Sequence, residues 1–145
     1  MESRDRLLSA LHEIQDRSPQ NYVSPDELDG LSHRFGLTMA ELRGVSSYYS
    51  MISLEPRGRH IVRVCVSPVC RMLGALDLLG LLKAELGIEV GETDPEGLFT
   101  LEETQCLGHC AGAPAMMVGA RVYEGLDVEG VRGIIAAYRK ARDHG

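Results

Sequence analysis

The sequence lacks the segments that would place a protein in a membrane or send it out of the cell. Its first residues contain no apolar core of a signal peptide. The longest leucine-rich stretch, residues 72–82, is interrupted by two glycines and an aspartate and is too short to span a bilayer. We therefore expect a cytoplasmic protein without direct membrane insertion, either separate or on the cytoplasmic face of a membrane complex.

Several binding and catalytic motifs are also missing. The chain has no Gly-x-Gly-x-x-Gly loop and no P-loop, so we expect it to bind neither NADH nor flavin by itself. It has no Cys-x-x-Cys pair, which excludes a thioredoxin-type dithiol, and no Cys-x4-Cys-x2-Cys run, which excludes a plant-type ferredoxin. The net charge of −6 argues against nucleic acid as a partner of the whole chain.

The chain does contain four cysteines in two close pairs. The pairs are Cys65-x4-Cys70 and Cys106-x3-Cys110, and each follows a segment that we expect to be a strand. In a reducing compartment, clustered cysteines serve as metal ligands or redox groups more often than as disulfides. Four thiolates that converge from two loops can hold either one tetrahedral metal ion or a two-iron cluster.

The spacing within the pairs favours a [2Fe–2S] cluster over zinc. Structural zinc is usually held by Cys-x2-Cys pairs, whereas the wider cluster suits looser loops with small residues, such as Ser67, Pro68 and Gly108. Zinc, a disulfide and unligated core cysteines remain as alternatives. His109 could replace a thiolate, but with four cysteines present we expect it to be an ordinary loop residue.

Residues 1–54 are expected to form a helical segment. Apolar residues recur at helical spacing between positions 7 and 14. Two capping boxes, Ser24-Pro25-Asp26-Glu27 and Thr38-Met39-Ala40-Glu41, each start a helix; the first helix should end at Gly36, and the second runs toward Gly44. The segment is too short to bury a large core of its own. We therefore expect its apolar side chains to pack against a partner protein, namely Leu7, Leu11, Ile14, Leu28, Leu31, Phe35, Leu42, Tyr48, Tyr49 and Met51.

Residues 55–145 show a mixed pattern that begins with a short linker at 55–58. Strands are expected at 61–65, 88–90, 98–103, 115–118 and 121–124. A helix is expected from Cys70 or Arg71 to Leu86, with an apolar stripe, and a last helix is expected from Asp127 to Ala141. The stripe consists of Leu73, Leu76, Leu79, Leu82 and Leu86. This order predicts an α/β sandwich of thioredoxin-like type.

Most other polar side chains have an ordinary interpretation. Glu102 and Glu103 are adjacent in a strand, point to opposite faces and are expected to be surface charges. The histidines outside the cysteine loops are expected to be solvated: His12, His33, His60 and His144. Four arginines around the first strand are either solvated or form a docking or cluster-tuning patch: Arg57, Arg59, Arg63 and Arg71.

Over almost its whole length the chain resembles the small thioredoxin-like [2Fe–2S] subunit of NADH:quinone oxidoreductase (respiratory complex I) and of related NAD-linked hydrogenases and formate dehydrogenases. The resemblance rests on four stretches and the Ala113-Pro114 pair that follows the last of them. The stretches are Gly44-Val45-Ser46-Ser47-Tyr48-Tyr49, Val64-Cys65-Val66-Ser67-Pro68-Val69-Cys70, Gly97-Leu98-Phe99-Thr100-Leu101 and Gln105-Cys106-Leu107-Gly108-His109-Cys110. Ser47 and Tyr48 stand where the family usually has Thr and Phe, and Gln105 where Glu is commoner.

The resemblance implies both a fold and a function. It implies an N-terminal helical segment at 1–54 and a thioredoxin-like [2Fe–2S] domain at 55–145, with Cys65, Cys70, Cys106 and Cys110 as cluster ligands. It further implies a subunit that carries single electrons beside the flavin of a larger subunit. That partner would hold FMN and the NAD site, and the chain alone would have no activity. A quinone reductase, a hydrogenase, a formate dehydrogenase or an electron-bifurcating enzyme could all use such a chain.

Two other classes of protein remain as alternatives. A zinc-stabilised interaction module would be colourless, whereas an iron–sulfur protein is brown. The two capped helices also resemble a helix-turn-helix DNA-binding regulator. However, residues 1–55 hold five Arg against nine Asp or Glu, which is unsuitable for phosphate contact.

Overall fold

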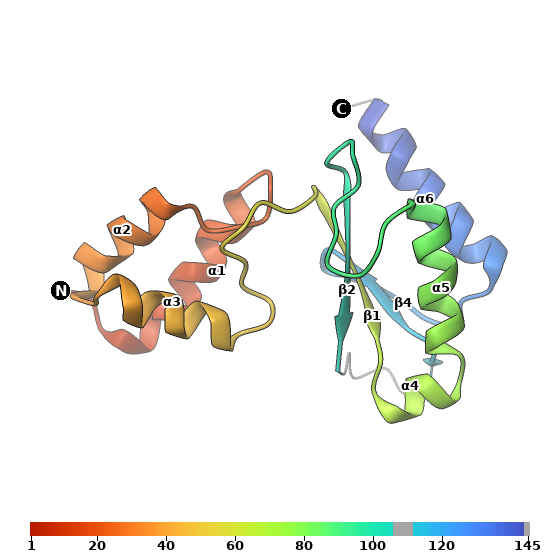
Figure 1. Cartoon of the computed structure of the whole chain (residues 1–145), viewed down its shortest axis with the longest axis horizontal. Helices are drawn as coiled ribbons and strands as arrows, with labels where there is room; N and C mark the ends of the chain where they lie inside the picture. Colours follow the sequence, from red (N-terminus) through yellow and green to blue (C-terminus); the bar gives the residue numbers. More distant parts are fainter. Residues whose placement is uncertain (106–111, 144–145) are drawn as a thin grey trace. The chain divides into compact units, whose positions relative to one another are not determined.

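The computed structural model describes residues 1–105 and 112–143. Its contacts divide the chain into two compact units, Met1–Arg59 and His60–Gly145, each with a hydrophobic core of its own. Figure 1 shows helices in the first unit and a mixed sheet with helices in the second. This confirms the predicted fold class of an N-terminal helical segment followed by an α/β domain. Within the described ranges, no helix is both long and apolar enough to cross a membrane.

The first unit contains the 3-10 turn η1 (Arg4–Arg6) and the helices α1 (Leu7–Arg17), α2 (Pro25–Phe35) and α3 (Met39–Tyr48). Both predicted capping boxes are present, with Ser24 and Thr38 as the capping residues. α2 ends at Gly36, as predicted, in a left-handed conformation that suits glycine. α3 continues past Gly44, because that glycine is not among those with a positive φ and does not end the helix.

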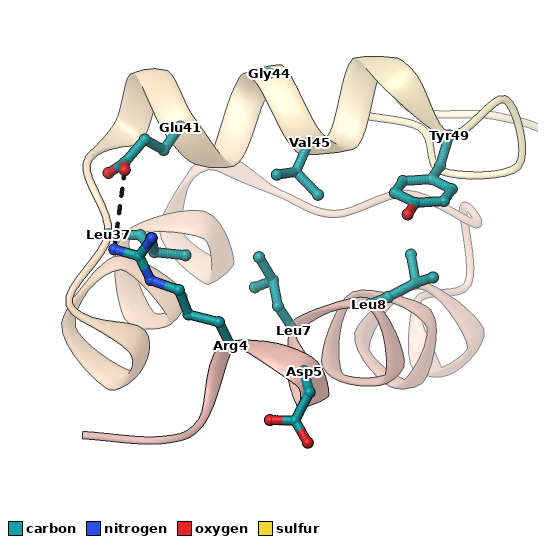
Figure 2. A pocket seen from close by; sticks show the side chains of 9 residues that line it. All are labelled: Arg4, Asp5, Leu7, Leu8, Leu37, Glu41, Gly44, Val45 and Tyr49. Atoms are coloured by element: carbon teal, nitrogen blue, oxygen red, sulfur yellow. Dashed lines mark ion pairs between the residues drawn. The ribbon is translucent and has the colours of Figure 1, made fainter.

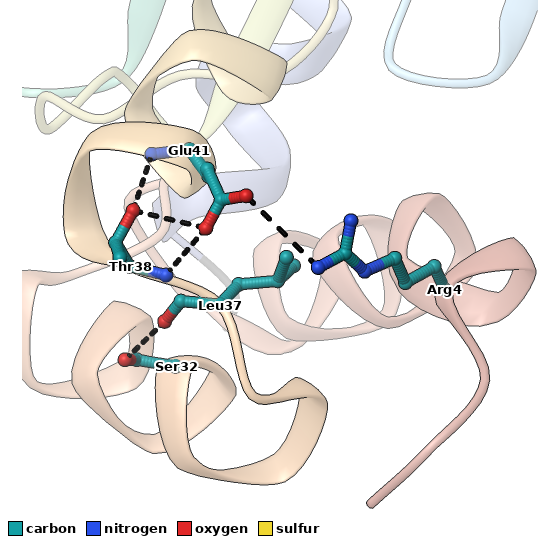
Figure 3. Close-up of polar contacts among 5 residues, drawn as sticks. All are labelled: Arg4, Ser32, Leu37, Thr38 and Glu41. Atoms are coloured by element: carbon teal, nitrogen blue, oxygen red, sulfur yellow. Dashed lines mark hydrogen bonds and ion pairs between the residues drawn. The ribbon is translucent and has the colours of Figure 1, made fainter.

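The connection between α2 and α3 is fixed by local hydrogen bonds, which Figure 3 shows together with a nearby arginine. The Thr38 hydroxyl accepts from the backbone amide of Glu41, whose carboxylate accepts in return from the amide of Thr38 at 2.8 Å. The Ser32 hydroxyl donates to the Leu37 carbonyl at 2.6 Å. Because these side chains bond amides and a carbonyl that the helices leave unpaired, the turn is stable without help from another unit.

The apolar residues of the first unit form its own core, contrary to our expectation. Eleven residues are buried there, including every aliphatic and phenylalanine side chain that we had assigned to a partner surface. They are Leu7, Ala10, Leu11, Ile14, Val23, Leu28, Leu31, Phe35, Leu37, Leu42 and Ile52. The prediction that this segment is too short to bury a large core of its own was wrong, because three amphipathic helices can bury one another's apolar faces. Of the residues that we assigned to a partner, Tyr48, Tyr49 and Met51 remain exposed.

The end of the first unit extends beyond residue 54. The Arg57 amide donates to the Gln20 carbonyl at 2.8 Å, and the Arg57 guanidinium donates to the Asn21 carbonyl at 2.8 Å. The Asn21 amide donates to the carbonyls of Gly58 and Arg59 at 2.8 and 2.9 Å. Residues 57–59, which include part of the expected linker, are therefore bonded to the helical unit.

The second unit is a four-stranded sheet with helices packed on one face. Its strands are β1 (His60–Cys65), β2 (Phe99–Thr104), β3 (Met116–Val118) and β4 (Arg121–Tyr123), in the order β2-β1-β3-β4. β1 is parallel to β2 and antiparallel to β3, which is antiparallel to β4. The helices are α4 (Pro68–Met72), α5 (Ala75–Leu86) and α6 (Val128–Asp143), and α5 and α6 lie on the same face of the sheet in Figure 1.

Alternation along β1 decides which residues face these helices. Val62 and Val64 belong to the core beneath α5 and α6. Because successive strand residues point to opposite faces, Arg63 and Cys65 lie on the other face of the sheet. The last helix starts as predicted, since the Asp127 carboxylate accepts from the Gly130 amide at 2.7 Å.

Two predicted elements differ from the structure. The helix expected from residue 70 to Leu86 is split into α4 and α5 at Gly74, whose φ of 103° interrupts the helical backbone. The strand expected at residues 88–90 is absent from the described strands. Instead, Ile88 anchors the turn in the core, and the chain meets β2 at an isolated bridge between Thr93 and Thr100.

Candidate metal centre

The first cysteine pair lies where β1 passes into α4. Cys65 is the last residue of β1, and Cys70 lies within α4, which begins at Pro68 after Ser67. Proline suits the first turn of a helix because its missing N–H would have no partner there. Both thiols are buried, and they pack with Ala75 in a small cluster separate from the main core.

Hydrogen bonds hold the loop that carries this pair. The Cys65 sulfur lies 3.2 Å from the Ser67 hydroxyl. The Arg71 guanidinium donates from Nε to the Val66 carbonyl at 2.8 Å, which fixes the arginine against the loop. Burial raises the pKa of the Cys70 thiol, and the neighbouring Cys65 thiol raises it further. Such thiols become thiolates when a cation replaces the proton.

Cys106, His109 and Cys110 lie outside the described residues, in the stretch 106–111, but the chain on both sides of that stretch meets Cys65. On the near side, the Cys65 sulfur lies 3.4 Å from the Gln105 carbonyl oxygen, and the Val66 amide donates to the Thr104 carbonyl at 2.8 Å. On the far side, the Cys65 amide donates to the Ala115 carbonyl at 3.2 Å. Described residues on both sides of the stretch 106–111 therefore lie beside Cys65 and Val66.

This arrangement fits a cofactor held by four thiolates. Two buried thiols pack together, one of them, Cys65, lies beside Gln105, and thiolate is the ligand that iron–sulfur clusters use. Within residues 1–105 and 112–143, no group of three His, Cys, Asp or Glu side chains is placed to hold a metal ion.

The four arginines do not behave as one group. Arg57 and Arg63 are buried, so neither the solvated interpretation nor an exposed docking patch describes them. Arg57 bonds the backbone of the first unit, and Arg63 pairs with Glu102 on β2, with Nε 3.4 Å from Oε2. Glu102 is thus more than the surface charge that we expected. This pair could not be found from the sequence, because it depends on the register of two strands far apart in the chain.

His60 also differs from its expected solvated state. Its ring centroid lies 4.7 Å from that of Tyr138 on α6 and 5.8 Å from that of Phe99 on β2. Aromatic contacts of this kind add to the packing of the second unit.

Exposed apolar side chains lie on α4, which carries Cys70, and just after it, and the sequence did not predict their exposure. Met72 is 85% exposed, and Val69, Leu73 and Leu76 are also exposed. Leu73 and Leu76 were assigned to the apolar stripe of the helix, but only Leu79, Leu82 and Leu86 of that stripe are buried. We call Val69, Met72, Leu73 and Leu76 the apolar collar. A groove of about 330 Å³ adjoins it, lined in part by Leu73, Pro114 and Val128.

The first unit has a groove of its own between η1, α1 and α3, shown in Figure 2. Its volume is about 640 Å³, and Leu7, Leu8, Leu37 and Val45 provide apolar lining. Arg4 and Glu41 lie at one end of the groove, with Arg4 Nη2 4.0 Å from Glu41 Oε1, and the Tyr49 ring lies at the other end.

Comparison with known proteins places this fold and site in a family. The model of the thioredoxin-like [2Fe–2S] ferredoxin family matches residues 1–139. A subunit of the NADH-quinone oxidoreductase of Aquifex aeolicus is 38% identical over 121 residues, which cover 83% of this chain and 74% of that protein. The HndA subunit of the NADP-reducing hydrogenase of Solidesulfovibrio fructosivorans is 30% identical over 132 residues, which cover 91% of this chain and 76% of that protein.

A solved structure supports the same assignment. The NAD⁺-reducing [NiFe]-hydrogenase in its H2-reduced state matches 97% of this chain with a TM-score of 0.81 and 26% identity. The match spans only 23% of that hydrogenase chain. Together, these matches confirm the resemblance seen in the motifs and the expected class, a [2Fe–2S] electron-transfer protein associated with oxidoreductases. The chain belongs to the thioredoxin-like [2Fe–2S] ferredoxin family.

Proposed function

We propose that Cys65, Cys70, Cys106 and Cys110 together hold one [2Fe–2S] cluster that carries single electrons. The observation that supports this most strongly is the contact of Cys65 with Gln105 on one side and Ala115 on the other, the two ends of the second cysteine loop. When bound, the cluster would supply one-electron oxidation and reduction. The protein's own contribution is to bury the thiols and to hold the loop between Val66 and Arg71.

The proposed partner is a larger subunit that holds FMN and the NAD site. NADH delivers two electrons as a hydride and a [2Fe–2S] cluster accepts one, so a flavin is needed between them. The chain has no dinucleotide motif of its own. In the hydrogenase that it resembles, the matched part is under a quarter of a longer chain. The larger subunit of this proposal would belong to a quinone reductase, hydrogenase, formate dehydrogenase or bifurcating enzyme.

We place the docking site for that subunit at the apolar collar. Val69 and Met72 lie on α4 together with Cys70, so a protein seated there would approach the cluster closely. Monomeric proteins rarely expose neighbouring large apolar side chains of this kind without a partner. Arg71 lies among them, fixed to the Val66 carbonyl, and supplies a positive charge. The matching surface would therefore be apolar with an acidic group opposite Arg71.

Metal analysis and reconstitution test this function. Protein purified or reconstituted without oxygen should contain about two irons and two acid-labile sulfides per chain. It should carry no flavin and should not oxidise NADH with an artificial acceptor until the larger subunit is added. Stoichiometric zinc without sulfide would contradict the cluster and would favour the alternative of a zinc-stabilised interaction module. NADH oxidation by the chain alone would overturn its role as an accessory carrier.

A further inference from the structure

We propose that the charges of Arg63 and Glu102, which form a partly buried ion pair, tune the reduction potential of the cluster in opposite directions. This inference rests on the proposed function, because it concerns the cluster at Cys65. It assigns Arg63 and Glu102 as positioning residues that act through their charge. Neither is a cluster ligand.

The Arg63–Glu102 pair lies close to the end of the strand that carries Cys65. Arg63 precedes Cys65 by two residues in β1, so both point to the same face of the sheet, about 7 Å apart along the strand. Glu102 is the register partner of Arg63 on β2, just as Thr104 is the partner of Cys65. The charge pair and the strand ends that carry the cysteine loops are thus neighbouring rungs of one parallel ladder.

The Arg63–Glu102 pair is also largely shielded from water. The Arg63 side chain is 10% exposed and that of Glu102 is 21% exposed, while most other ion pairs of the described residues have one or both side chains far more open to water. Taking two charges out of water is costly, and a buried pair often adds little net stability compared with apolar side chains. Its electric field, however, is screened less than that of a surface charge. Each of these two charges should therefore act on a nearby redox centre more strongly than a surface charge at the same distance would.

The sign of the effect follows from the charge that reduction adds. A reduced cluster carries one more negative charge than an oxidised one. A positive charge nearby therefore favours reduction, and a negative charge opposes it. Glu102→Gln removes a negative charge and should raise the potential, whereas Arg63→Gln removes a positive charge and should lower it. With both substitutions, the two shifts should largely cancel.

The test is a redox titration of the full reconstituted chain, followed by visible absorption and electron paramagnetic resonance. For each single variant we expect about a tenfold change in the ratio of reduced to oxidised cluster at a fixed potential, which for one electron is about 59 mV. The double variant should return close to the original value.

Glu103→Gln is the matched control. It removes the same charge one residue further along β2, from an exposed side chain that alternation directs to the opposite face. We expect a clearly smaller shift from it. Equal shifts in E102Q and E103Q, or no shift in E102Q, would overturn the proposal, even if the variants had lost thermal stability. If the Arg63→Gln variant does not bind a cluster, the comparison of the potential shifts of E102Q and E103Q tests the proposal by itself. Failure of the unsubstituted chain to bind a cluster would instead overturn the proposed function.

Discussion

The sulfur of Cys65 lies 3.4 Å from the carbonyl oxygen of Gln105, a residue forty positions further along the chain. The parallel pairing of β1 with β2 produces this contact, because it brings the ends of both strands to the same edge of the sheet. Each strand ends at a cysteine loop. The sheet thereby places Cys65 beside Gln105, the residue that precedes Cys106 in the sequence.

We predict that each of the four cysteines is needed for the cluster. Replacing Cys65, Cys70, Cys106 or Cys110 by Ser exchanges a soft thiolate for a hydroxyl, so iron and sulfide content should fall sharply. His109→Ala is the control and should keep its cluster. The measurement is iron and sulfide analysis with the visible spectrum. Loss of the cluster in the His109 variant alone would reverse the ligand assignment.

We predict that the apolar collar binds the flavin-bearing subunit. Met72→Gln combined with Leu76→Gln should weaken that binding about tenfold, or 1.4 kcal/mol, because two apolar contacts are lost while the exposed positions leave the fold intact. Val90→Gln changes an exposed apolar residue that is not part of the collar, and serves as the control. Titration calorimetry measures both. If the control weakened binding of the larger subunit equally, the assignment of the collar to the interface would be wrong.

We predict that the two units can be separated. A chain that starts at His60 keeps all four cysteines and the whole core of the second unit, so its cluster spectrum should match that of the full chain. Its binding to the large subunit should fall, because the exposed Tyr48, Tyr49 and Met51 are lost. If the shortened protein lost its cluster but bound normally, the helical unit would have a structural role at the cluster.

We predict that the cap of α3 stabilises the first unit. Thr38→Ala should cost about 1 kcal/mol in unfolding experiments. Ser47→Ala is the control within the same helix, since its hydroxyl bonds only the Gly44 carbonyl among the described contacts, and should change stability by less than about 0.5 kcal/mol. The Thr38 amide lowers the pKa of Glu41 below its ordinary 4.5. The contribution of Glu41 to the stability of the folded state is therefore present above pH 4.5 and is lost as the solution becomes more acidic.

We predict that the second unit loses folding stability at alkaline pH because of Tyr138. Burial raises the pKa of Tyr138 to about 12, and its hydroxyl lies 3.1 Å from that of Tyr123. The folded state therefore holds this proton more tightly than the unfolded chain, where the ordinary value is 10.0. The stabilisation is complete below pH 10 and is lost as the pH rises through about 12. In Tm measurements, Tyr138→Phe should lessen the alkaline decline, and the exposed Tyr48→Phe should not.

Several features were predictable because they depend on residues close together in the chain. Ser24 with Glu27 and Thr38 with Glu41 form their capping boxes within one helical turn, and Asp127 caps α6 in the same way. The family assignment, too, rests on short stretches around the cysteines and is confirmed by the family model. The complete ligand set stays a prediction, since residues 106–111 lie outside the described part of the chain.

The sequence by itself determined the helix starts, the apolar positions and the two cysteine pairs, because these follow from local hydrogen bonding and residue chemistry. Only the tertiary structure decided what covers each apolar side chain: Leu28 and Phe35 are buried in the core of their own unit, whereas Leu73 and Leu76 are exposed beside Cys70. It also decided that Arg63 meets Glu102. Periodicity shows which face of an element is apolar, but the partner of that face depends on strand register and packing between distant segments, which no local pattern contains.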